Sequence, residues 1–181
     1  MAHFEKMLSQ ETVYDGRVLR LTRDTVALEN GGTALREIVR HHGGACVAAL
    51  TAENEVYLVR QFRYAIGREM WELPAGRLEA GEDPFAAAQR ELTEEAGVTA
   101  DTWLELGPFY PTVGYCTEAI HLYAAKDLHP AAMHLDEDEF LEPYRVPLDE
   151  AVRRILAGEI RDSKTIIGCL KLKELRAAGK F

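Results

Sequence analysis

Hydrophobic and polar positions along the chain predict strands on both sides of one strongly marked helix. Two turn signals, Asp15-Gly16 and Asn30-Gly31-Gly32, divide residues 11–41 into strands whose side chains alternate in polarity, as they do in hairpins. The runs Ala45–Leu50 and Val56–Val59 are more apolar, which is typical of central strands. Further strands are expected at residues 103–110 and 119–125, and two C-terminal helices at about 148–157 and 163–177.

The strongly marked helix is predicted between Asp83 and Gly97. Asp83 is a good N-cap, Pro84 suits the first helical position, and Gly97 suits the left-handed residue that ends a helix. Four apolar residues recur at helical spacing and are expected to face the core: Phe85, Ala88, Leu92 and Ala96. The glutamates of this segment are therefore expected to project from another face.

Three glutamates, Glu91, Glu94 and Glu95, lie on one face of this helix because they are spaced at i, i+3 and i+4. The helix dipole disfavours each of them by about 0.3–1 kcal/mol. Repulsion between Glu91 and Glu95 costs about 0.2–0.5 kcal/mol more, and Arg90 offsets part of this. A divalent metal held by oxygen ligands would remove the remaining repulsion. The alternative is a solvent-exposed acidic face, which is the usual role of charge clusters.

These glutamates form part of a longer motif that begins at Gly76. The chain matches Gly-x5-Glu-x7-Arg-Glu-(apolar)-x-Glu-Glu-x-Gly-(apolar) at all nine constrained positions, from Gly76 to Val98. This pattern resembles the signature of the Nudix hydrolases, which cut nucleoside diphosphates linked to another moiety. The surrounding stretch, VYLVRQFRYAIGREMWELPAGRLEAGEDP, is similar to the ADP-ribose pyrophosphatase branch of that superfamily.

The resemblance implies an α/β fold, namely a Nudix α/β/α sandwich around a mixed sheet with a small N-terminal antiparallel β-sheet before it. Residues 1–40 are expected to form this N-terminal β subdomain, and residues 41–181 the Nudix hydrolase domain. In the family the N-terminal sheet exchanges with a partner. The resemblance therefore implies dimerisation through residues 1–40 and a homodimer in which the active site is completed.

Composition narrows the possible partners. With 181 residues, 47% of them hydrophobic, the chain is long enough to bury a sizeable core. The net charge of −9 argues against a nucleic-acid partner, because phosphate contacts need clustered Lys and Arg. The three widely spaced cysteines contain no CxxC pair and indicate reduced thiols in a cytoplasmic protein. No apolar run approaches membrane-spanning length, so no membrane partner is expected.

Pyrophosphate hydrolysis requires a water molecule to reach a strongly anionic phosphorus, and bound Mg²⁺ can neutralise the oxygens and lower the pKa of that water. Glu91 and Glu95 lie one helical turn apart and are predicted to be the main metal ligands, with Glu94 as a third. The resemblance implies the backbone carbonyl of Ala75 as a further ligand. We expect Mg²⁺, with Mn²⁺ as a possible substitute.

Two residues of the motif are expected to support the metal site. Arg90 would orient the carboxylates through charge-assisted hydrogen bonds. Glu82 is expected to brace the loop and the start of the helix, because a carboxylate near a helix N-terminus is already favourable there. Direct metal binding by Glu82 is the alternative.

The resemblance also implies a general base in a mobile loop after the last central strands, here residues 134–139. Glu139 is the first choice and Glu137 the second. A solvent-exposed acidic loop without a catalytic function is the alternative, since charge runs usually have that role.

Substrate contacts are expected from Arg63, Arg60 and Glu118. Arginine binds phosphate through paired donors, and Arg63 is the better match to the family's substrate arginine. The resemblance implies hydrolysis of ADP-ribose to AMP and ribose 5-phosphate. Many such enzymes have Ser-Pro-Gly where this chain has Thr112-Val113-Gly114. A broader nucleoside diphosphate sugar hydrolase, acting for example on GDP-mannose or ADP-glucose, therefore stays open as the alternative.

A non-catalytic sensor with the same fold is a second alternative, and a purely structural dimer is a third. A sensor would be expected to lack at least one of the three helix glutamates, and all three are present. A structural dimer gives no reason for the unfavourable acidic face.

Overall fold

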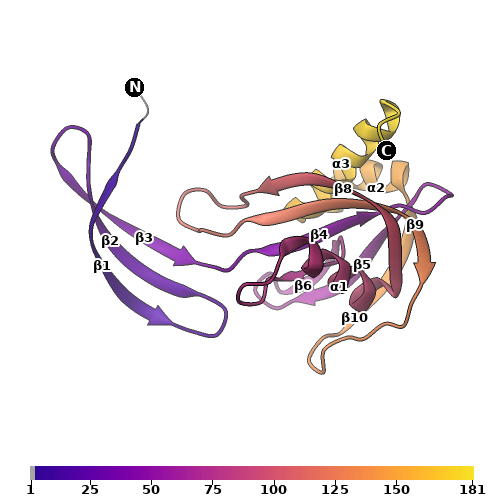
Figure 1. Ribbon diagram of the computed structural model, residues 1–181, viewed down its shortest axis with the longest axis horizontal. Coiled ribbons are helices and arrows are strands. Elements are labelled where there is room, and N and C mark those ends of the chain that lie inside the picture. The colour runs from indigo at the N-terminus through magenta and orange to yellow at the C-terminus, as the bar shows by residue number, and fades with distance from the viewer. Residues whose placement is uncertain (1–2) are drawn as a thin grey trace. The chain divides into compact units, whose positions relative to one another are not determined.

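The chain is divided into two units in the computed structural model, which describes residues 3–181. The N-terminal unit consists of the residues up to Gly43 together with Tyr110–Ala119, and the main unit consists of Gly44–Phe109 together with Ile120–Phe181. Each unit has its own β-structure (Figure 1). The segment 110–119 thus groups with the first strands, although it is distant from them in the sequence.

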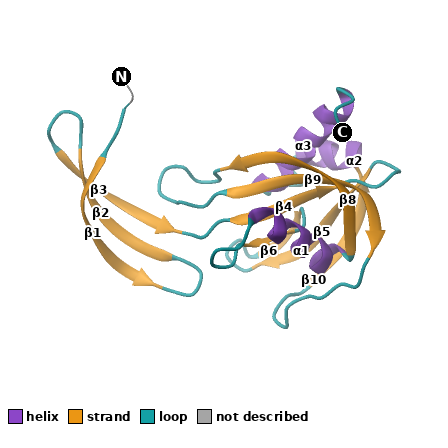
Figure 2. Cartoon of the chain, viewed as in Figure 1, coloured by secondary structure: helices purple, strands orange, loops and turns teal. Residues whose placement is uncertain are grey.

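The N-terminal unit contains a three-stranded antiparallel sheet in the order β1-β2-β3 (Figure 2). Its strands are β1 (Lys6–Asp15), β2 (Arg20–Ala27) and β3 (Thr33–Arg40), so the predicted hairpins are confirmed. The segment 110–119 joins β3, because the Val39 N–H donates to the Tyr115 carbonyl at 2.8 Å and the Thr117 N–H donates to the Val39 carbonyl at 2.9 Å.

Two sheets form the main unit. One has the order β7-β4-β9-β8 and is mixed, because β4 and β9 are parallel and the other pairs are antiparallel. The other is antiparallel, in the order β10-β5-β6. The bounds are β4 (Gly44–Ala49), β5 (Glu55–Arg63), β6 (Arg68–Glu72), β7 (Ala75–Arg77), β8 (Val98–Phe109), β9 (Ile120–Pro130) and β10 (Leu141–Pro147).

The sequence pattern missed β6, β7 and β10 and made β5, β8 and β9 too short. Pro143 and Pro147 give β10 the appearance of a loop. Proline is nevertheless tolerated on an edge strand, because the N–H that it lacks can be one that would face solvent and not a neighbouring strand. β10 lies at such an edge.

Helices cover both faces of the mixed sheet, as β4 shows. Ala45, Val47 and Ala49 face α1 (Pro84–Ala96), whereas Cys46 and Ala48 belong to the core formed with α2 (Leu148–Leu156) and α3 (Ser163–Ala177). The alternation follows from the two-residue period of a strand. α1 lies on one side of the sheet, and α2 and α3 lie on the other (Figure 1). The α/β/α sandwich is therefore confirmed. None of the helices formed by residues 3–181 is both long and apolar enough to span a membrane.

The predicted helix and its caps are also confirmed. The Asp83 side chain accepts hydrogen bonds from the N–H groups of Phe85 and Ala86, both at 3.0 Å, which is a cap worth about 1 kcal/mol. Gly97 has φ 65° and its N–H donates to the Thr93 carbonyl. One expected core residue differs, because Phe85 is 36% exposed. It lies in the first turn and packs edge-on against Trp103, with ring centroids 5.2 Å apart.

The alternative of a solvent-exposed acidic face does not hold for two of the three glutamates. Glu91 is 7% exposed and Glu95 is 1% exposed, so both lie inside the fold and not on a solvated face. The reason is the strand beside them: α1 packs against the short strand β7, where Gly76 has no side chain. The buried carboxylates fill that space.

Candidate active site

The site is built where α1 meets β7. A Cβ atom added to Gly76 would lie 1.9 Å from Oε1 of Glu91, so the glycine leaves the room that this carboxylate occupies. Oε2 of Glu95 accepts a hydrogen bond from the Ala75 N–H at 2.7 Å. Two acidic side chains from one helix are thus held against the backbone of a single strand.

Burial makes this pair of carboxylates electrostatically unfavourable. It raises the pKa of Glu91 to about 7, although the charge and hydrogen bond of Arg90 act in the opposite direction. Burial also raises the pKa of Glu95 well above its usual range, against the hydrogen bond from Ala75, and the charges of Glu91 and Glu139 add to the effect. The protein therefore supplies less positive charge than the pair requires, which is a common property of functional sites.

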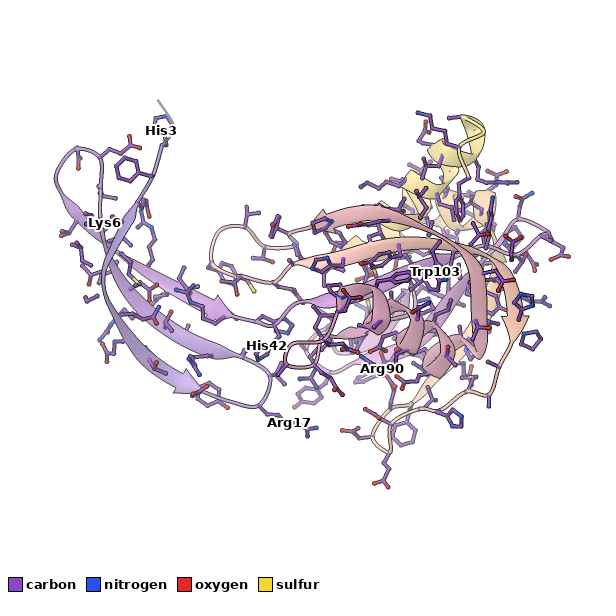
Figure 3. The ribbon with its side chains drawn as sticks, viewed as in Figure 1. His3, Lys6, Arg17, His42, Arg90 and Trp103 are labelled. Carbon is purple, nitrogen blue, oxygen red and sulfur yellow. The ribbon has the colours of Figure 1, made fainter. Side chains whose placement is uncertain are left out.

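Arg90, which is labelled in Figure 3, binds three acidic side chains of the motif. Its Nε donates to Glu82 at 3.0 Å, and its Nη1 donates to Glu91 at 2.6 Å and to Glu94 at 2.9 Å. The hydrogen bonds expected between Arg90 and the carboxylates are thus present. Glu82 also accepts from the Glu79 N–H at 2.9 Å, so it ties the loop before α1 to Arg90.

The residues fit a divalent metal, but the side chains alone do not enclose one. Across residues 3–181 no three His, Cys, Asp or Glu side chains converge on one point in a way that could hold a metal ion. Arg90 engages Glu94, and Glu95 is turned to the Ala75 N–H. What is present is a buried pair of hard oxygen donors beside the backbone at residues 75–76, and this donor type suits Mg²⁺.

The two candidate bases lie in the same loop but in different surroundings. Glu139 is half-buried, and its Oε1 lies 3.4 Å from Nε2 of Gln61. Its charge acts on both Glu91 and Glu95. Glu137 is exposed in the turn of the loop. The structure therefore brings Glu139, and not Glu137, toward the acidic pair.

Arg60 and Arg63 differ by the face of β5 on which they lie. They are three residues apart, so their side chains point to opposite sides of the sheet. Arg63 donates from Nε to Glu72 at 2.6 Å and from Nη2 to Glu72 at 2.8 Å. These bonds raise the pKa of Arg63 against the effect of burial, and the charge of Glu95 raises it further. Arg60 instead pairs with Glu69 and lies over the ring of Trp71. Arg63 is thus on the side of the acidic pair.

Glu118 belongs to the N-terminal unit. There its Oε1 lies 3.6 Å from Nδ1 of His41. The segment that carries it pairs with β3, as described above. Its expected contact with substrate stays a prediction.

A group of buried charges next to Arg63 was not predicted from the sequence. Glu72 is bound by both Arg63 and Lys164, and Lys164 also contacts Asp162. A signal for this group was present: Glu72 is a charged residue between two large apolar residues, Trp71 and Leu73. A charge at such a position requires a buried partner.

Comparisons with known proteins agree with the fold and the motif. The family model described as the NUDIX domain matches residues 40–167, and the model described as the nucleoside diphosphate sugar hydrolase N-terminal domain matches residues 5–39. A solved structure described as an ADP compounds hydrolase has the same fold, with a TM-score of 0.83 at 23% identity over 98% of this chain and 97% of that one.

Two relatives match almost the whole chain. A methanol dehydrogenase activator from Bacillus methanolicus is 44% identical over 94% of each chain. An ADP-ribose pyrophosphatase from Bacillus subtilis (strain 168) is 39% identical over 97% of each chain. Together with the family model and the complete motif, these matches show that the protein belongs to the Nudix hydrolase superfamily, in its ADP-ribose pyrophosphatase-like branch.

Proposed function

We propose that this protein is a Mg²⁺-dependent pyrophosphohydrolase that converts ADP-ribose to AMP and ribose 5-phosphate. The observation that carries the proposal is the pair of buried carboxylates, Glu91 and Glu95, held against the backbone at Gly76 inside a complete Nudix motif. The similarity to an ADP-ribose pyrophosphatase over nearly the whole chain supports this substrate. Reduced cysteines, of which Cys46 and Cys169 are buried, support a cytoplasmic location.

In this proposal Glu91 and Glu95, with the Ala75 carbonyl, are the main metal ligands, and Glu94 is the third side chain. The bound metal, Mg²⁺ or in its place Mn²⁺, would neutralise diphosphate oxygens and lower the pKa of a water molecule. Arg90 keeps Glu91 and Glu94 oriented through its two Nη1 hydrogen bonds.

The remaining roles belong to side chains around this acidic pair. Glu139 removes a proton from the attacking water, because a carboxylate that is not bound to metal is the better proton acceptor. Arg63 binds the diphosphate of the substrate. Both of its bonds to Glu72 use Nε and Nη2, so its Nη1 edge is directed away from that carboxylate.

A broader nucleoside diphosphate sugar hydrolase is the alternative. The description of the N-terminal family model names that wider substrate class, and the segment Thr112-Val113-Gly114 departs from the pattern of many ADP-ribose enzymes. The name of the Bacillus methanolicus relative describes an effect on another protein.

We expect ADP-ribose to be the best substrate when product formation with Mg²⁺ is compared across ADP-ribose, GDP-mannose, FAD and dinucleoside polyphosphates. The products should be AMP and ribose 5-phosphate, separated by anion-exchange chromatography. If ADP-ribose ranks among the poorest of the four, the substrate assignment is wrong. GDP-mannose as the best substrate would favour the broader alternative.

Replacing the most buried carboxylate should abolish turnover without unfolding the protein. Glu95→Gln is expected to lower kcat by about 100-fold or more, because an uncharged amide is a poor ligand for Mg²⁺. The amide oxygen can still accept the Ala75 hydrogen bond, so circular dichroism should be unchanged and Tm without Mg²⁺ should not fall. The rise in Tm on adding Mg²⁺ should disappear. Glu53→Gln, an exposed turn position, is the matched control. Unchanged kcat in Glu95→Gln would contradict the ligand role.

The loop carboxylates should differ in importance. Glu139→Gln is expected to lower kcat by about 10²–10⁴-fold, as removal of a general base does. Glu137→Gln should have little effect, because Glu137 is exposed in the turn. Steady-state kinetics with saturating Mg²⁺ would measure both. A large loss in Glu137→Gln with normal turnover in Glu139→Gln would reverse the assignment.

We also infer that the protein is a homodimer and that the N-terminal unit mediates dimerisation. All ten residues of β1 are exposed, and Val26 is the one apolar residue buried in this unit within residues 3–43 and 110–119. A three-stranded sheet with so small a core is marginally stable when alone. Six large apolar side chains within residues 6–40 are exposed: Met7, Leu8, Val13, Tyr14, Val18 and Leu35. Contact with a second copy would cover such a patch.

Analytical ultracentrifugation should give a mass of twice 20.3 kDa for the native chain. The double variant Leu8→Lys with Leu35→Lys should shift the protein toward the monomer, because it places charges in the proposed contact. Leu156→Lys, at an exposed leucine of α2, is the control and should leave the dimer intact. A native chain that sediments as a monomer at micromolar concentration would refute the inference.

A further inference from the structure

A compact network of buried charges joins the end of β6 to the start of α3. Glu72 is 3% exposed, and the side chain of Lys164 is 13% exposed. The Lys164 ammonium contacts Oε2 of Glu72, and it lies 3.1 Å from Oδ1 of Asp162. The other partner of Glu72 is Arg63. Two acids and two bases thus balance each other in a place where an unpaired charge would be costly.

Hydrogen bonds fix the backbone around Lys164, both within the first turn of α3 and to the residue that follows β6. Asp162 is the N-cap of α3, and its Oδ2 accepts from the Thr165 N–H at 3.0 Å and from the Thr165 hydroxyl at 2.6 Å. The same hydroxyl accepts a hydrogen bond from the Leu73 N–H at 2.8 Å. Gly168 permits this close approach, since a Cβ atom there would lie 2.4 Å from Leu73 Cδ1. The start of α3 is therefore locked to the residue that follows Glu72.

Glu72 is the shared member of the network. Its Oε1 receives Nε of Arg63, and its Oε2 receives both Nη2 of Arg63 and the ammonium of Lys164. A side-on pair of this kind fixes the plane of the guanidinium as well as its position. Without the lysine, Arg63 alone would face Glu72 while Asp162 lost its own cationic partner. The carboxylate would then have no second contact to hold it in place.

We propose that Lys164 is a positioning residue for the hydrolase reaction. By holding Glu72 at Oε2, the oxygen that also accepts from Nη2 of Arg63, it fixes the guanidinium that receives the substrate's diphosphate. Groups that support a binding residue in this way act on affinity and geometry and do not touch the substrate. The proposal rests on the proposed function, because it assigns diphosphate binding to Arg63.

The test compares Lys164→Met and Lys164→Arg with the native enzyme and with Lys171→Met. Lys171 lies on the same helix, and its ammonium donates to the Leu106 carbonyl at the protein surface. With Mg²⁺ and ADP-ribose, Lys164→Met should raise KM by about tenfold or more, as loss of a charge-assisted contact does. Its kcat should fall less than KM rises. Lys164→Arg should restore most of the affinity, and Lys171→Met should behave as the native enzyme does.

A double-mutant cycle separates positioning from independent binding. The affinities of the native protein, Arg63→Met, Lys164→Met and the double variant for ADP-ribose and for inorganic pyrophosphate would be measured by calorimetry with Ca²⁺. The loss in the double variant should equal the loss in Arg63→Met alone, because Lys164 acts through Arg63. Additive losses, or native affinity in Lys164→Met, would overturn the proposal.

Two controls keep the outcome interpretable. If Lys164→Met does not fold, Lys164→Gln and Lys164→Arg replace it in the same cycle, and equal affinity of these two variants would also overturn the proposal. A native protein that binds pyrophosphate through Arg63 but hydrolyses none of the four substrates would refute the proposed function alone. A native protein that binds neither ligand would refute both.

Discussion

The arrangement of the main unit depends on one contact, that between the carboxylates of α1 and the backbone of β7. Burial of two neighbouring acids is unfavourable, and a fold keeps them only if the surrounding structure determines their place. Here the Asp83 cap and the left-handed Gly97 set the ends of α1, and the apolar residues Ala88 and Leu92 fix its rotation on the sheet. Glu91 and Glu95 are thereby held beside β7, where they are almost completely buried.

Arginines compensate this charge without removing it. Arg90 binds Glu82, Glu91 and Glu94, and Arg63 is held by Glu72 on the other side of the site. Glu95 receives only a backbone N–H as a direct partner among the contacts in residues 3–181. Arginine side chains therefore surround the acidic pair, but Glu95, its most buried member, has no cationic side chain as a hydrogen-bond partner among these contacts. This leaves Glu95 available to bind a divalent cation. This distribution suits a site in which an anionic substrate must approach a strongly acidic protein.

Local signals in the sequence were sufficient for α1, its caps and the bond between Arg90 and Glu94, because all of these depend on residues close together in the chain. The burial of Glu91 could not be predicted, since it depends on where a strand fifteen residues earlier is placed. The alternation of side chains along a strand shows that Arg60 and Arg63 point to opposite faces of β5, but it does not show which face lies toward the acidic pair. That required the orientation of β5 in the sheet. The bond between Lys164 and Glu72 joins residues 92 positions apart, and no local pattern indicates such a pair.

Gly76 shows how folding and chemistry can make separate demands on one position. Its φ angle is not among the positive values that favour glycine, so the backbone there is open to any L-residue. The atoms that a methyl group would meet belong to the carboxylate of Glu91 and not to the backbone. A larger residue at this position would therefore displace that carboxylate from the place beside β7 where it is buried. Gly76 is thus needed less for the strand itself than for the position of a side chain fifteen residues later.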